Sequence, residues 1–196
     1  MFDEMQNRII DAAMELIMEK GYSAATTRDI AKKAGINECT IFRKFKGKKE
    51  IVLSAMELPK WNPKLSEEDF SFVGDLERDL ISFSEVYRSR VTPRMVKISI
   101  GLRTPELYPH IADGILEIPR TCKTVLIRYF QEMKEQLSGT DYESMAMMFL
   151  SMNFGFVFLN ASFGKKLTVL EEEDYIRSFV QLFLNGIRKP EGGDRI

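Results

Sequence analysis

The chain has 196 residues, of which 44% are hydrophobic and 29% are charged, and its formal net charge is −1. These values are typical of a soluble globular protein with one or two domains and exclude a disordered chain. The N-terminus lacks the basic and apolar regions of a secretory signal, and the two cysteines show no metal-type spacing. We therefore expect a cytoplasmic protein with no metal and no cofactor.

Apolar residues recur at helical spacing through most of the chain, and no convincing pair of alternating strands is found. The sequence therefore predicts an all-α protein of about nine helices. The first helix is expected over residues 3–20, where Ile9, Ala13 and Ile17 form an apolar stripe that ends before Gly21.

The next stretch predicts two short helices joined by a glycine turn. Thr26 can cap the first of them, and Gly35 can end it in a left-handed conformation. In the second, over residues 38–45, the spacing of Ile41 and Phe45 lets both side chains pack back on the first. This pattern is the sequence form of a helix-turn-helix.

A local excess of positive charge coincides with these helices. Between residues 28 and 49 there are eight lysine and arginine side chains and two acidic ones, a net charge of +6 in a chain of −1. A basic patch on a mildly acidic protein is expected of a surface that contacts nucleic acid. Charge alone is equally compatible with a solvated surface, and the two-helix pattern is what favours DNA.

Several short motifs run continuously through the N-terminal quarter of the chain. They are Ala12-Ala13, Gly21-Tyr22, Thr27-Arg28-Asp29-Ile30-Ala31, Ala34-Gly35-Ile36, Ile41-Phe42 and Phe45-Lys46. On these residues the segment 8–56 closely resembles the DNA-binding domain of the tetracycline-repressor (TetR) family of bacterial transcriptional regulators. The resemblance implies an N-terminal three-helix DNA-binding domain and a C-terminal helical domain for effector binding and dimerisation.

The fourth helix, which begins near Lys48, is followed by two prolines, Pro59 and Pro63, that break the helical pattern. We therefore expect a DNA-binding domain over residues 1–57, with the helix-turn-helix at about 27–46. An effector-binding and dimerisation domain is expected over residues 58–189, followed by a tail over residues 190–196.

The resemblance also implies which residues contact DNA. They are Thr27, Arg28, Asn37, Glu38, Cys39, Thr40, Phe42, Arg43, Lys46 and Lys48. The N-terminal turn of the second short helix would enter the major groove, with the remaining positions at phosphates.

Three of these positions depart from the family pattern. Phe42 replaces the usual tyrosine and loses a phosphate-binding hydroxyl, while Glu38 repels phosphate but can accept a hydrogen bond from the amino group of a cytosine. Cys39 replaces a small residue; a close approach to DNA explains it better than redox sensing, which would need a lowered pKa.

In the second half a helix is expected over about residues 73–88, and Thr92-Pro93 and Thr104-Pro105 indicate two further helix starts. Pro109 and Pro119 predict short or kinked helices before a longer one over residues 120–136. Capping boxes at Thr140–Glu143 and Thr168–Glu171 would open the last two helices.

Residues 144–164 contain no charged side chain and are long enough to span a membrane. Their scattered serines and asparagines instead favour a helix that is covered by protein, partly by a second subunit. The apolar stripe of the final helix lacks an obvious partner within so small a domain, and the resemblance implies a four-helix dimer interface. The sequence therefore predicts a homodimer whose interface includes Phe154, Phe158, Ile176, Phe179, Val180 and Phe183.

Methionine and aromatic side chains suit an adaptable apolar pocket, although each is also an ordinary core residue. The resemblance favours a pocket for a small hydrophobic or aromatic effector. The candidate lining residues are Trp61, Phe83, Tyr87, Met95, Tyr108, Phe130, Met148, Met152, Asn153 and Phe156. His110, the only histidine, has no second ligand nearby and is not expected to bind metal.

The sequence thus predicts a DNA-binding transcriptional regulator, a repressor released from a palindromic operator by a small hydrophobic ligand. A dimeric DNA-binding regulator without an effector pocket is the alternative, because a packed core and a liganded pocket share the same composition. An enzyme is disfavoured, since the sequence has no nucleophile elbow, phosphate-binding glycine loop or histidine pair.

Overall fold

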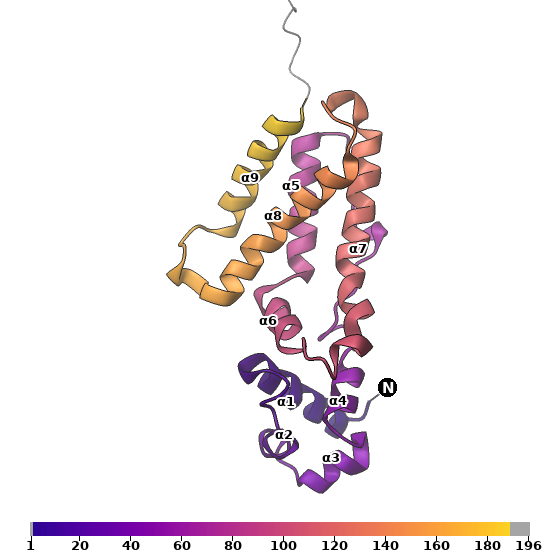
Figure 1. The fold of residues 1–196 in the computed structure, drawn as a ribbon, viewed down its shortest axis with the longest axis vertical. Helices are drawn as coiled ribbons and strands as arrows, with labels where there is room; N and C mark the ends of the chain where they lie inside the picture. Colours follow the sequence, from indigo (N-terminus) through magenta and orange to yellow (C-terminus); the bar gives the residue numbers. More distant parts are fainter. Residues whose placement is uncertain (1, 189–196) are drawn as a thin grey trace, which may run out of the picture. The chain divides into compact units, whose positions relative to one another are not determined.

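The computed structural model describes residues 2–188, and over that range it contains nine α-helices and no strand beyond an isolated bridge between Leu137 and Arg188 (Figure 1). The predicted all-α class is confirmed, and the predicted tail lies outside the described residues. The helices are α1 (Glu4–Lys20), α2 (Thr27–Ala34), α3 (Glu38–Phe45), α4 (Lys48–Ala55), α5 (Leu76–Arg90), α6 (Pro93–Gly101), α7 (Tyr108–Glu132), α8 (Tyr142–Phe163) and α9 (Glu172–Ile187).

The described residues form two compact units, each with its own apolar core. The first unit holds the chain up to Lys64 together with Pro93–Glu117, and the second holds Leu65–Thr92 and the chain from Ile118 onward. This division differs from the predicted domains, which separate after residue 57. The difference arises because α6 and the start of α7 pack with the N-terminal helices.

Local signals set the ends of the first two helices, and the predicted cap of α2 at Thr26 is confirmed. The Asp3 carboxylate accepts a hydrogen bond from the Gln6 backbone N–H at 2.8 Å, and the Thr26 hydroxyl accepts one from that of Asp29 at 3.1 Å. Both are capping boxes, which satisfy backbone groups that have no partner within the helix. Gly35 ends α2 with φ of 66°, in the left-handed region that glycine adopts without a Cβ penalty.

A buried apolar core fixes the angle between α2 and α3. Ile30 of α2 and Ile41 of α3 are fully buried, and Phe45 is nearly so. Burying each of these side chains contributes about 1.5–3 kcal/mol to stability. Ile41 and Phe45 are four residues apart and share one face of α3, so the opposite face of this helix is exposed to solvent.

The C-terminal end of α6 approaches the C-terminal end of α1 backbone to backbone. The Tyr22 N–H donates a hydrogen bond to the Gly101 carbonyl at 3.0 Å. A Cβ added at Gly101 would lie 2.8 Å from the Ile17 carbonyl oxygen, closer than real Cβ atoms come. Only glycine therefore permits this contact, which includes α6 in the first unit.

The prediction of separate short helices before a longer one that starts at residue 120 is wrong. α7 is a single helix of 25 residues that contains both Pro109 and Pro119. Pro109 is its second residue, where the missing N–H has no helical partner to lose. The helix begins at Tyr108, whose N–H donates to the Thr104 carbonyl at 2.9 Å, and not directly after the Thr104-Pro105 signature.

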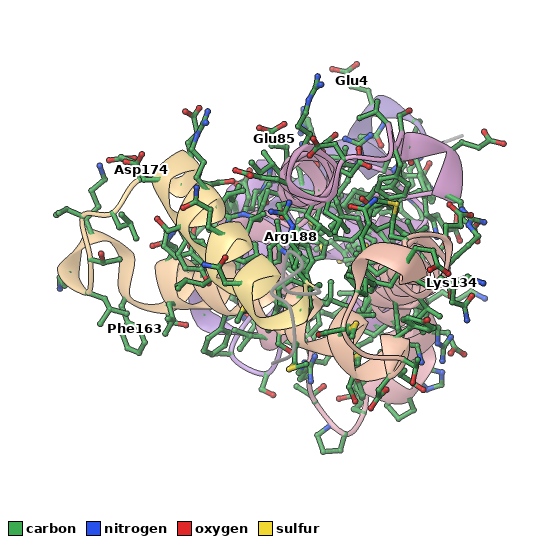
Figure 2. All side chains as sticks on the ribbon, turned by 90° about the horizontal axis from the view of Figure 1, so that it is seen from above. Glu4, Glu85, Lys134, Phe163, Asp174 and Arg188 are labelled. Atoms are coloured by element: carbon green, nitrogen blue, oxygen red, sulfur yellow. The ribbon has the colours of Figure 1, made fainter. Side chains whose placement is uncertain are left out.

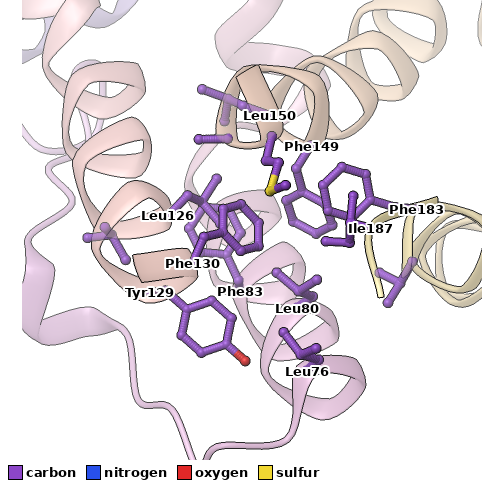
Figure 3. Close-up of a cluster of buried hydrophobic side chains, with 14 of the residues drawn as sticks. Leu76, Leu80, Phe83, Leu126, Tyr129, Phe130, Phe149, Leu150, Phe183 and Ile187 are labelled. Carbon is purple, nitrogen blue, oxygen red and sulfur yellow. The ribbon is translucent and has the colours of Figure 1, made fainter. Parts of the chain in front are cut away.

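Aromatic rings from four helices form the core of the second unit. Figure 3 shows Phe83 of α5, Phe130 of α7, Phe149 of α8 and Phe183 of α9 gathered between their helices. The ring centroids of Phe149 and Phe183 are 5.0 Å apart, and those of Phe83 and Phe149 are 5.8 Å apart. Such tilted pairs stabilise a core beyond the area that they bury.

A buried carboxylate organises the segment that leads into α5. Asp79 accepts hydrogen bonds from the Val73 and Gly74 backbone N–H groups at 2.8 and 2.9 Å and from the Tyr129 hydroxyl at 2.9 Å. Burial raises the pKa of Tyr129, and the bond to Asp79 acts in the same direction. This network joins α5 to α7 and satisfies the buried carboxylate.

The predicted capping boxes of α8 and α9 are wrong. Asp141, and not Thr140, caps α8, because its carboxylate accepts from the Ser144 N–H at 3.0 Å. The Thr168 hydroxyl accepts from the Leu170 N–H at 3.1 Å in the preceding loop, so α9 starts without a side-chain cap. Threonine and aspartate compete for such local backbone groups, and sequence spacing alone does not decide between them.

Among the described residues, the helical stretch Tyr142–Lys166 is long and apolar enough to cross a membrane by length and composition. One face of α8 is instead packed into the second core through residues such as Phe149 and Leu150. Its opposite face is exposed, and Figure 2 shows Phe163 projecting outward from the end of the helix.

We expect Gly101→Ala to lower the free energy of unfolding by about 1–3 kcal/mol, because its methyl group would collide with the Ile17 carbonyl. Chemical denaturation measures the change. Gly186→Ala is the control, since nothing lies within 4 Å of a Cβ at this exposed position of α9, and there alanine should raise helix stability. Equal effects of the two substitutions would show that the backbone contact does not matter.

Candidate nucleic-acid interface

The helix α3 is fixed at its N-terminus by Asn37. The Asn37 side-chain oxygen accepts a hydrogen bond from the Cys39 N–H at 2.9 Å, which leaves its two amide hydrogens free. Arg43 is exposed on this helix, and Phe42 exposes 51% of its surface. The residues of α3 that are predicted to contact DNA therefore lie on an exposed helix, and the Phe42 ring is accessible for packing against DNA.

A hydrogen bond links the starts of the two motif helices. The Thr27 hydroxyl, in the first turn of α2, donates to Oε1 of Glu38 at 2.6 Å. Glu38 is the first residue of α3, where the positive end of the helix dipole favours a carboxylate. The structure thus brings together two predicted DNA-contact residues that lie 11 positions apart in the chain.

Ion pairs divide the basic side chains of this region into two groups. Lys33 pairs with Glu19 at 2.9 Å and with Glu15 at 3.3 Å, and Lys44 pairs with Asp3 at 2.6 Å. Four exposed cations form no ion pair within residues 2–188: Arg28, Lys32, Arg43 and Lys46. The local positive charge is therefore concentrated on fewer side chains than the sequence indicates.

Lys48 is not positioned as predicted for a phosphate contact. Its Nζ donates hydrogen bonds to the backbone carbonyls of Tyr22 and Ala25 at 2.5 and 2.7 Å and lies 4.1 Å from the centre of the Tyr22 ring. Burial lowers the pKa of Lys48. The Lys48 side chain instead links α4 to the turn between α1 and α2, because its ammonium group binds the loop carbonyls in place of solvent.

Lys46 ends α3 with φ of 63°, a left-handed conformation that is uncommon for a residue with a side chain. Its N–H donates to the Phe42 carbonyl at 3.1 Å, and its side chain is exposed. Glycine would adopt this conformation more easily, so the lysine is kept at a conformational cost next to the exposed face of α3.

The remaining predicted contacts are compatible with the same surface. Cys39 is an exposed free thiol, and Thr40 is half-buried.

His110 lies on the start of α7 in the first unit, with its Nε2 2.8 Å from Nζ of Lys49. No cluster of three or more potential metal ligands occurs among the described residues.

The predicted pocket residues do not gather in one unit. Three of them, Trp61, Met95 and Tyr108, belong to the first core or pack against it. Trp61 is fully buried there and donates a hydrogen bond from its ring nitrogen to Asp11 at 3.0 Å. Sequence composition identifies these side chains as apolar without showing which core receives them.

The other seven pocket candidates belong to the second unit but have different surroundings. Phe83 and Phe130 are central in its core, while Met148 and Met152 are exposed on α8. Burial of Tyr87 raises the pKa of its hydroxyl. The last two, Asn153 and Phe156, are buried on the inner face of α8.

The predicted interface residues of α9 are covered within the same chain, so the expectation that this stripe lacks a partner is wrong. Its four residues belong to the second core: Ile176, Phe179, Val180 and Phe183. The reason is that α9 packs along α5 and α8, as Figure 1 shows. Phe154 and Phe158 of α8 are exposed, and their place in a dimer interface stays a prediction.

Sequence patterns did not single out Arg88, a charged residue buried in the second unit. A signal was present, because Leu76, Leu80, Ser84 and Arg88 are spaced by four residues and share one face of α5. A charge that continues an apolar stripe indicates a buried, paired group.

Comparison with known proteins agrees with this arrangement. Residues 9–55 match the family described as bacterial regulatory proteins, tetR family. The HTH-type transcriptional regulator YvkB of Bacillus subtilis is 32% identical over 183 residues, which cover 92% of this chain and 95% of YvkB. IcaR of Staphylococcus epidermidis, the negative transcriptional regulator of the biofilm operon icaADBC, is 26% identical and is covered to 99%.

Solved structures with the same fold include NalD, the secondary repressor of the MexAB-OprM multidrug efflux pump in Pseudomonas aeruginosa. It superposes with a TM-score of 0.66 over 95% of this chain and 97% of NalD, at 16% sequence identity. Because the match to YvkB extends along nearly the whole chain and the family match covers the helix-turn-helix, the chain belongs to the tetR family of bacterial regulatory proteins and is a DNA-binding transcriptional regulator.

Proposed function

We propose that the protein is a cytoplasmic repressor that binds an inverted-repeat operator as a homodimer and is released by a small apolar effector. The observation that carries the DNA-binding part is the group of exposed, unpaired cations around α2 and α3. The sequence relative IcaR and the structural neighbour NalD carry names that describe a negative regulator and a repressor.

Each side chain of the surface has a proposed role. Thr27, Arg28 and Lys46 contact phosphates, and the four residues Asn37–Thr40 face base edges in the major groove. Arg43 contacts a guanine or a phosphate, and the Phe42 ring packs on the sugar-phosphate backbone. Because Thr27 donates to Oε1 of Glu38, Oε2 of that carboxylate is left to accept from a cytosine amino group.

The exposed face of α8 supports the proposed homodimer. Seven apolar side chains are exposed on it: Met147, Met148, Met152, Phe154, Phe158, Leu159 and Phe163. No charged residue lies between Glu143 and Lys165, so no charge interrupts this face. A contiguous apolar surface of this kind marks a protein interaction site, and a second copy would place two recognition helices for successive major grooves.

The proposed effector acts on the second unit and changes the affinity for DNA. Its influence is limited by the difference between its affinities for the DNA-binding and the released conformations. The dense aromatic core of the second unit favours an alternative, a dimeric regulator with no effector. Binding of a small molecule that leaves operator affinity unchanged would support that alternative.

Selection from a random-duplex library with the full-length protein, followed by sequencing, tests the proposed function. We expect enrichment of an inverted repeat whose half-site centres lie about one helical turn, roughly 34–36 Å, apart. Weak binding that is sensitive to salt and enriches no sequence would contradict specific recognition by a dimer.

We expect Arg43→Ala to weaken binding to the selected operator by about 1–3 kcal/mol if it reads a base, or to reduce the salt dependence by about one charge if it contacts a phosphate. Fluorescence anisotropy over a range of salt concentrations separates the two results. Lys33→Ala is the control, because Glu15 and Glu19 already hold that lysine. Equal losses in both variants would mean that only the overall charge matters.

We expect Phe158→Glu to weaken self-association at least about tenfold, because dimerisation would bury the new carboxylate in the interface without a partner. Analytical ultracentrifugation measures the dissociation constant. Ile100→Glu on α6 changes an apolar side chain of similar exposure, 49% against 38%, and should leave association unchanged. Dimers of unchanged strength in the Phe158 variant would place the interface elsewhere.

A further inference from the structure

One lysine at the start of α4 is directed at the protein and not at solvent. The ammonium group of Lys48 donates hydrogen bonds to the carbonyls of Tyr22 and Ala25 at 2.5 and 2.7 Å, and it lies 4.1 Å from the centre of the Tyr22 ring. Both Tyr22 and Ala25 are buried. An ammonium group has three donors, so these two bonds leave at most one for a further partner.

The charges around Lys48 are compatible with this position. Burial lowers the pKa of Lys48, and the Glu106 carboxylate opposes that effect. The Tyr22 hydroxyl donates to Oε1 of the same carboxylate at 3.5 Å. A movement of the ammonium group to a phosphate would take it from two carbonyls and from the Tyr22 ring at the same time, which costs free energy.

The two carbonyls belong to the turn that leads into α2. Ala25 directly precedes Thr26, the residue that caps this helix. The N–H groups of Thr27 and Arg28 have no acceptor within the helix, and a helix start of this kind favours a phosphate. Lys48 therefore fixes the chain immediately before the helix end that is proposed to contact phosphates.

Lys46 provides a contrast two residues earlier in the chain. Its side chain is exposed and forms no ion pair within residues 2–188. Both lysines have the same charge, but only the ammonium group of Lys46 is open to a phosphate. The two side chains therefore differ in how they can influence DNA binding.

We propose that Lys48 is a positioning residue for DNA binding, which links α4 to the turn at Tyr22 and Ala25 and so places the start of α2 against a phosphate. Lys48 itself does not contact DNA. This assignment rests on the proposed function, in which Thr27 and Arg28 contact phosphates, and it adds a residue that acts through them.

Acetylation of lysine side chains, measured by mass spectrometry on the full-length protein with and without the selected operator, tests whether Lys48 contacts DNA. Operator at about ten times its dissociation constant should slow acetylation of Lys46 about tenfold by mass action and leave that of Lys48 unchanged. In the free protein Lys48 should react more slowly than Lys46, because its nitrogen is bound to two carbonyls. Protection of Lys48 by the operator to the same degree as Lys46 would overturn the assignment.

A double-mutant cycle tests whether Lys48 acts through the start of α2. Lys48→Met retains an aliphatic chain over the Tyr22 ring and removes the ammonium group. We expect Lys48→Met and Arg28→Ala each to weaken operator binding about tenfold. The double variant should bind about as well as the weaker single variant, since both changes remove the same phosphate contact. Losses that multiply, or an unchanged dissociation constant for Lys48→Met, would contradict the assignment.

The matched control combines Lys48→Met with Arg43→Ala. Arg43 lies in the last turn of α3 and not in the segment that Lys48 binds, so these two losses should multiply. Titration at stoichiometric concentrations gives the active fraction of each variant. A smaller active fraction of Lys48→Met with an unchanged dissociation constant would mean that Lys48 only stabilises the fold, which would also overturn the assignment.

Acetylation of the free protein separates this inference from the proposed function. Acetylation of Lys48 as fast as that of Lys46 without DNA contradicts only the positioning role. Loss of sequence preference in the unchanged protein contradicts the proposed repressor itself.

Discussion

The backbone contact between α1 and α6 determines what the first unit contains. Because Gly101 has no side chain, its carbonyl can reach the Tyr22 N–H next to Ile17, and α6 packs directly on the helix that supports the DNA-binding motif. The start of α7 belongs to the same unit, whereas the rest of this helix belongs to the second. A displacement of α6 would therefore act on the support of the recognition helix without an intervening loop.

In the first unit, only some of the basic side chains are available to bind DNA. Three of the basic side chains near α2 and α3 are held by the protein: Lys33 and Lys44 by carboxylates and Lys48 by loop carbonyls. The first two pairs are exposed and contribute little to stability. These ion pairs instead change the electrostatic potential of the surface. The carboxylates neutralise Lys33 and Lys44, so the positive potential comes from the unpaired cations close to the exposed face of α3.

The second unit combines a dense aromatic core with buried polar side chains. Phe83, Phe149 and Phe183 are packed ring against ring and leave little freedom for a ligand at that point. Arg88 lies by contrast beside Phe156, and Arg88 and Asn153 each have an atom without a hydrogen-bond partner among the described residues. Composition cannot separate these two regions, since both are rich in aromatic residues, but the hydrogen-bond inventory does.

The sequence by itself determined the local features: the cap of α2, the left-handed turn at Gly35, the core positions of α3 and the helix-turn-helix with its family. These depend on residues within a few positions of one another, where spacing and backbone chemistry decide the outcome. Only the tertiary structure decided that α7 continues through Pro119, that the stripe of α9 is covered by its own chain, and that Lys48 is engaged while Arg88 is buried. Each of these results depends on partners distant in the chain, which compete for the same carbonyls, charges and apolar faces. Of the four, only the burial of Arg88 has a signal in neighbouring residues, the four-residue spacing along α5.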